Sequence, residues 1–134
     1  MNIHNLAVVS AVVAGLFGLA ALLVPAQFLA PFGVELTEPG LVVTRLFGVN
    51  VLAIAVLDWF ARTELRGGGR PGAERGIVLV NVLSPTLSAI LLVTAIFSGM
   101  VNALGWVNVA ILAVLAVAWV YFGLVERRTA DAVA

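Results

Sequence analysis

The sequence predicts an all-α membrane protein in which four transmembrane helices form a single bundle. Of its 134 residues, 63% are hydrophobic and only 10% are charged, whereas a soluble domain carries about 25% charged residues. Four stretches are also long and apolar enough to cross a bilayer, which takes about 20 helical residues. Little sequence lies outside these stretches, so residues 1–134 form one transmembrane domain.

The four expected helices span about residues 6–24, 41–60, 77–97 and 104–122. Residues 1–5 contain no Lys or Arg, so the basic start of a signal peptide is missing, and we expect the first stretch to remain as a membrane helix. The third stretch contains Pro85, which frees the backbone carbonyl of Asn81 one turn earlier. Residues 27–32 are too few to span and should lie at the interface, with Phe28, Leu29 and Phe32 reaching the acyl chains.

The arginines predict how the helices are oriented. Six of the seven lie in the second connection or after the fourth helix: Arg62, Arg66, Arg70, Arg75, Arg127 and Arg128. With four spans, these segments and both termini share one side, and short loops rich in basic residues stay in the cytoplasm. We therefore expect an inner (plasma) membrane protein with both termini cytoplasmic. The use of arginine without lysine favours a bacterial source.

Aromatic residues mark the expected ends of the spans, because their rings prefer the depth of the headgroups. The cytoplasmic belt comprises Trp59, Phe60, Trp119, Tyr121 and Phe122.

Small residues recur along the first helix at spacings of three and four, which places them on one face. They are Ala7, Ala11, Ala14, Gly15, Gly18 and Ala21. Small residues let membrane helices approach closely. This face is either a dimerisation surface or a packing surface inside the bundle, and the second interpretation is favoured because a four-helix bundle needs such faces internally.

Two ionisable residues lie within the expected spans, and such residues are costly in lipid. Arg45 is expected to pair with Glu35 or Glu38 of the first connection, or with Asn108; the alternative is recognition of an anion. For Asp58, the favoured interpretation is an ion pair with Arg62 at i+4.

The alternative for Asp58 is a proton or cation site shared with Asn81 and Ser10, which reach a similar depth. Asn81, Ser84 and Ser88 form a polar stripe on one face of the third helix, and we expect them to face the bundle interior. Together with Asn50 and Asn108 they form either interhelical hydrogen bonds, which is favoured, or a polar track across the bundle.

Several kinds of chemistry lack their usual residues. The chain has no cysteine, and His4 is its only histidine, so thiol chemistry and a metal site are not expected. A lone terminal histidine also cannot build a catalytic triad with a serine and an aspartate. The net charge is zero, which points to no nucleic-acid partner. We expect neither a cofactor nor an enzymatic activity.

Short motifs resemble those of small bacterial four-helix membrane proteins grouped near the DoxX-like proteins. They are the run at residues 44–50, the run at 57–62, Pro31-Phe32-Gly33, and Gly105-Trp106 at the start of the last helix. The resemblance covers most of the chain. It implies the four-span architecture and supplies no catalytic residues.

Three functions are compatible with these features, and the first is favoured over the other two because the chain has no catalytic constellation, very small soluble parts and a smooth small-residue helix face. The first is association, either with copies of the same chain or as an accessory subunit of a larger membrane complex embedded in the lipid bilayer. The second is a carrier or channel for a small solute or ion, built around the polar residues. The third is a membrane protein that binds a lipid, quinone or pigment within the bundle.

The predicted orientation can be tested with a single cysteine at position 68. Because the arginine-rich connection should be cytoplasmic, a membrane-impermeant thiol reagent added to intact cells should not label Gly68→Cys. Efficient labelling from outside would show that the protein has the opposite orientation.

Overall fold

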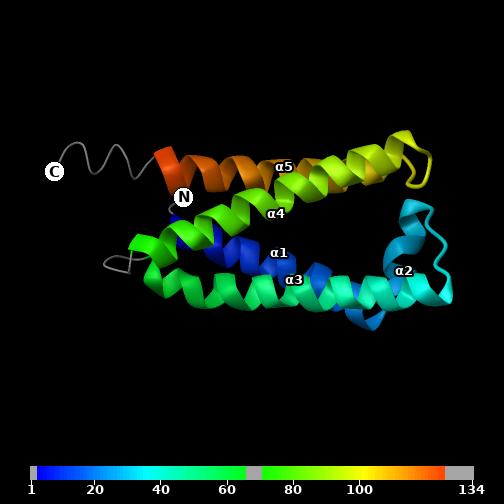
Figure 1. Ribbon diagram of the computed structural model, residues 1–134, viewed down its shortest axis with the longest axis horizontal. Coiled ribbons are helices and arrows are strands. Elements are labelled where there is room, and N and C mark those ends of the chain that lie inside the picture. Colours follow the sequence, from blue (N-terminus) through cyan, green and yellow to red (C-terminus); the bar gives the residue numbers. More distant parts are fainter. Residues whose placement is uncertain (1–2, 66–70, 126–134) are drawn as a thin grey trace.

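The computed structural model describes residues 3–65 and 71–125, and every element in these ranges is helical (Figure 1). The elements are α1 (Ile3–Leu23), α2 (Pro25–Leu29), the short 3-10 helix η1 (Ala30–Phe32), α3 (Glu38–Glu64), α4 (Pro71–Phe97), α5 (Gly105–Val120) and η2, a π-helical turn (Tyr121–Val125). Four of the described helices are long and apolar enough to cross a membrane. The predicted class, an all-α protein with four transmembrane helices, is confirmed.

Two of the helices are longer than the apolar stretches that predicted them. α3 begins at Glu38 rather than near 41 and ends at Glu64, and α4 begins at Pro71 rather than near 77. Hydropathy detects only the part of a helix that crosses the hydrocarbon, and the polar end turns remain helical beyond it. At the start of α3, the Thr37 hydroxyl accepts a hydrogen bond from the backbone N–H of Gly40, which caps the helix.

The helices pack as two close pairs, α1 with α3 and α4 with α5. α1 and α3 cross where Gly18 meets Gly48. A Cβ atom on Gly48 would lie 2.7 Å from the backbone nitrogen of Leu22 and 2.8 Å from the carbonyl oxygen of Gly18, so the two backbones are in contact. This is the close approach that small residues allow in membranes.

The small-residue face of α1 lies largely within this structure. Ala7, Ala11, Gly18 and Ala21 are buried, while Ala14 and Gly15 are half-buried. Large apolar side chains point outward on all four long helices, as expected of a surface that meets lipid tails.

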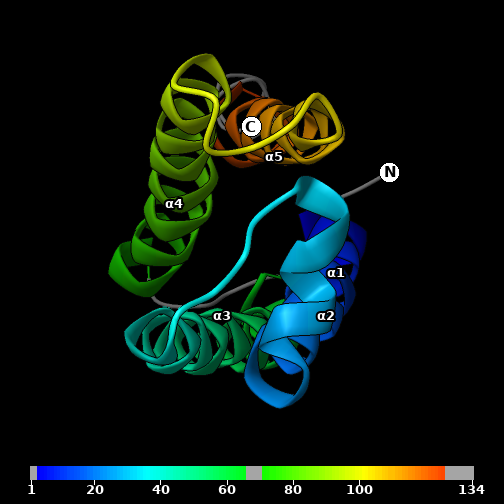
Figure 2. The same cartoon turned by 90° about the vertical axis from the view of Figure 1, so that its right-hand side faces the viewer.

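The two pairs meet at one end of the bundle, where α1 begins, α3 ends, α4 begins and α5 ends (Figure 1). The buried core lies there, and it consists of Ile3, Leu6, Ala7, Ala61, Leu65, Ile77, Val78 and Trp119. Figure 2, a view from the opposite end, shows α3 and α4 well apart at that end. The bundle is therefore tightly packed at one end and open at the other.

α2 and η1 fold across the open end. The Asn102 side chain, in the α4–α5 connection, donates a hydrogen bond to the carbonyl of Pro31 (2.9 Å), and its backbone N–H donates to the carbonyl of Phe32 (2.9 Å). The segment lies at the end of the bundle as expected. Phe28, Leu29 and Phe32, however, line an internal cavity rather than reaching only the acyl chains.

The Gly18–Gly48 crossing predicts a large effect for one methyl group. Gly48→Ala should lower the free energy of unfolding by about 1–3 kcal/mol, because the new methyl meets backbone atoms that cannot rotate away. Unfolding in mixed micelles at increasing SDS fraction measures this. Gly76→Ala is the control: nothing lies within 4 Å of its Cβ position, so stability should hold or rise slightly. Equal stability of both variants would show that the crossing is not close.

Candidate functional site

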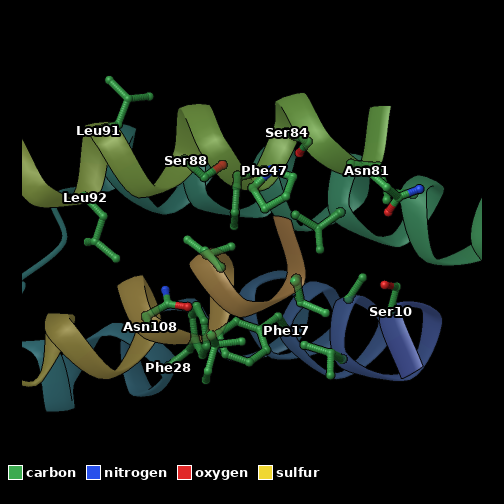
Figure 3. A pocket seen from close by; sticks show the side chains of 18 of the residues that line it. Ser10, Phe17, Phe28, Phe47, Asn81, Ser84, Ser88, Leu91, Leu92 and Asn108 are labelled. Carbon is green, nitrogen blue, oxygen red and sulfur yellow. The ribbon is translucent and has the colours of Figure 1, made fainter. Parts of the chain in front are cut away.

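A cavity of about 450 Å³ lies between the two helix pairs, a size typical of ligand pockets (Figure 3). Its walls are mostly apolar and include residues of all four long helices together with α2 and η1. Its polar side chains come from all four long helices, and they are Ser10, Asp58, Asn81, Ser84, Ser88 and Asn108.

Asp58 and Asn81 form the buried polar end of this cavity. Asp58 is 0% exposed, and its Oδ1 accepts a hydrogen bond of 2.6 Å from the Asn81 side chain. The same amide nitrogen donates to the carbonyl of Ile77 (3.1 Å), so both of its hydrogens are used. The second carboxyl oxygen of Asp58, Oδ2, is buried and has no hydrogen-bond partner. Buried polar atoms of this kind are uncommon.

A second buried hydrogen bond joins the two helix pairs beside this carboxyl. The indole Nε1 of Trp119 donates to the Ser10 hydroxyl oxygen at 2.8 Å, and Trp119 is only 1% exposed. Trp119 was predicted to belong to the aromatic belt at the membrane surface, and that prediction is wrong. Its ring contributes both to the core and to the cavity wall.

Three further polar side chains face the cavity with their hydrogen-bonding groups unused. Ser84 and Ser88 follow Asn81 along α4, and Asn108 faces them from α5 (Figure 3). Within residues 3–65 and 71–125 these three side chains form no hydrogen bond. The favoured interpretation of the polar residues as interhelical links therefore fits Asn81 and not these three.

The expected ion pair between Asp58 and Arg62 does not form. The Arg62 guanidinium lies over the Trp59 ring, 3.8 Å from its centroid, and donates to the Trp59 carbonyl. Asp58 points into the bundle, whereas the arginine stays at the surface, where its charge is hydrated.

Arg45 and Asn50 lie outside the site. Both are exposed on α3, and the Asn50 side chain donates to the carbonyl of Leu46 in its own helix (2.8 Å). Arg45 forms no ion pair or hydrogen bond within the described ranges, so the expected partners Glu35, Glu38 and Asn108 are wrong for this structure. Spacing along one helix shows which side chains share a face, but not whether a residue such as Arg45 or Asn50 faces the cavity or the outside of the bundle.

The cavity opens sideways between α3 and α4. Phe47 on α3 and Leu91 on α4 line it, yet they are 50% and 69% exposed. The two helices separate toward this end, as Figure 2 shows. In a bilayer this opening faces lipid tails rather than water.

No protein-family model, curated protein or solved structure matches this chain. The resemblance to DoxX-like proteins therefore stays an expectation. Within the described residues, no group of three or more His, Cys, Asp or Glu side chains is placed to hold a metal ion.

Sequence reasoning missed part of the site. It singled out the polar residues of α3, α4 and α5, but not the aromatic wall formed by Phe17, Phe28, Phe32 and Phe47. In a chain this apolar, a phenylalanine that faces a cavity has the same sequence signal as one that faces lipid.

The Trp119–Ser10 hydrogen bond yields a stability prediction. Ser10→Ala should lower the free energy of unfolding by about 1 kcal/mol, because the buried indole N–H loses its acceptor. Ser98→Ala is a suitable control, since the exposed Ser98 hydroxyl donates only to the carbonyl of Ala95 in the adjoining last turn of α4. Unfolding in mixed micelles compares the two, and no loss of stability in Ser10→Ala would mean that the bond contributes nothing.

Proposed function

We propose that this protein binds a small membrane-soluble molecule in the cavity between its two helix pairs. The observation that carries the proposal is a cavity of about 450 Å³, largely apolar, with a buried polar end. Ligand sites combine an apolar wall with a few polar groups that fix orientation. The matching ligand is an amphiphile with an apolar body and a single polar head.

The orientation of the ligand in the cavity follows from the distribution of polar groups along its wall. Its head reaches Asp58 and Asn81, at the end where the helix pairs meet, and its body lies along Phe17, Phe28 and Leu112. It enters from the lipid between Phe47 and Leu91, so an apolar molecule need not cross water.

The other two functions have less support from the same geometry. Association was motivated by the small-residue face of α1, and most of that face is buried within the chain. A carrier or channel needs polar groups along the whole path, but the end beneath α2 is lined by Phe28, Leu29, Phe32 and Val34. A non-catalytic binding protein therefore fits better than either.

The proposed setting is the inner membrane of a bacterium, with both termini in the cytoplasm. The arginine distribution supports this orientation. The unpartnered Asp58 would then lie toward the cytoplasmic side, and the lateral opening in the outer half of the bilayer.

A cavity-blocking variant tests the proposal. Ser88→Phe introduces a ring into the cavity, whereas Leu87→Phe introduces the same ring on the neighbouring lipid-facing position. Each protein would be extracted with its surrounding lipid and purified, and the molecules bound to it identified by mass spectrometry of the organic extract. One species should be enriched over bulk lipid with the parent and with Leu87→Phe, and reduced roughly tenfold with Ser88→Phe, a difference of about 1.4 kcal/mol.

Two results would count against a binding function. One is an extract that has the composition of the bulk membrane for all three proteins. The other is an enriched species that Ser88→Phe retains in full, which would place the binding surface outside the cavity.

A further inference from the structure

We propose that Asp58 recognises the head of the ligand as a protonated amine. This inference rests on the proposed binding function and deepens it by naming the class of ligand: a long-chain amine whose ammonium group meets the free carboxyl oxygen.

One oxygen of the Asp58 carboxyl lacks a hydrogen-bond donor. Oδ1 is occupied by the Asn81 amide, and that amide has no hydrogen left to donate. Oδ2 is buried and accepts no hydrogen bond from the protein, and Asp58 is one of the residues that line the cavity. A ligand head that fits must therefore carry a hydrogen-bond donor for Oδ2.

The Asp58 carboxyl also has no cationic partner among the described residues. Arg62, the arginine closest in sequence, is held at the surface by the Trp59 ring and carbonyl. Arg45 is exposed on α3 and lies outside the cavity lining. No described basic side chain forms an ion pair with Asp58, whose single hydrogen-bond partner in the described ranges is the neutral Asn81. An ionised carboxylate in apolar surroundings is costly without an opposite charge, and an ammonium supplies that charge together with a donor.

Other polar side chains near Asp58 can accept the remaining hydrogens of an ammonium group. An ammonium carries three hydrogens, and one of them satisfies Oδ2. Ser10 and Ser84 line the same end of the cavity, and each offers a hydroxyl oxygen as a further acceptor (Figure 3). Trp119 lies beside them, so its fluorescence reports arrival of the head.

The test compares probes of equal chain length that differ only in the head: dodecylamine, dodecanol and dodecanal. The protein carries Trp59→Phe and Trp106→Phe, which leaves Trp119 as its only tryptophan. Titration of each probe into the protein in lipid nanodiscs is followed by Trp119 emission. Dodecylamine should bind at least roughly tenfold more tightly than dodecanol.

Two variants distinguish recognition of the head group from occupation of the cavity. Asp58→Asn keeps the shape of the side chain and removes its charge, so it should abolish the preference for the amine while dodecanol binds as before. Ser88→Phe should weaken the binding of every probe by roughly tenfold. The comparison of probes on the protein with Asp58 intact does not depend on the folding of any variant.

The outcomes distinguish the two proposals. If no probe changes Trp119 emission, the binding function itself fails, and this inference fails with it. If the probes bind but dodecanol matches dodecylamine, or Asp58→Asn keeps the amine preference, only the role of Asp58 is overturned. Tightest binding of dodecanal, whose head only accepts hydrogen bonds, would assign a protonated carboxyl that donates and would also overturn the proposal.

Discussion

The crossing of α1 and α3 at Gly18 and Gly48 is the contact on which the rest of the structure depends. Because the two backbones touch there, these helices lie side by side along much of their length, and the small-residue face of α1 is occupied. α5 consequently has few contacts with α1, and the second pair joins the first mainly through the core at one end. The compact bundle expected from four apolar stretches becomes two hairpins that meet at one end.

Asp58 stands at the point where the two pairs separate. One turn further along α3, Ala61 and then Leu65 belong to the core, whereas one turn earlier Ile54 faces the cavity. A carboxyl at this junction is removed from water by the core and belongs to the residues that line the cavity. The same geometry explains why Arg62 does not pair with Asp58, since the Arg62 guanidinium lies over the Trp59 ring on the outer surface.

The sequence was sufficient for the fold class and for several lining residues, because both depend on periodicity along a single helix. Asn81, Ser84 and Ser88 share a face at spacings of three and four, and all three line the cavity as that spacing predicts. The rest depends on how helices are arranged. Asp58 with Arg62, and Arg45 with the acidic connection, are equally plausible pairs by spacing, but neither pair forms. Arg62 packs on the Trp59 ring, and Arg45 has no ion pair or hydrogen bond among the described residues. The sequence likewise predicts a surface position for Trp119, because only the fold shows that Ser10 of α1 accepts a hydrogen bond from its indole.

The cap formed by α2 and η1, tied to the α4–α5 connection through Asn102, has a consequence for how any ligand equilibrates. With the end covered and the side open between α3 and α4, exchange takes place with the hydrocarbon phase. Occupancy is then governed by the mole fraction of ligand among lipids, not by its concentration in buffer. Added lipid dilutes the ligand at constant protein, and a detergent whose tail fits beside Phe47 acts as solvent and competitor at once.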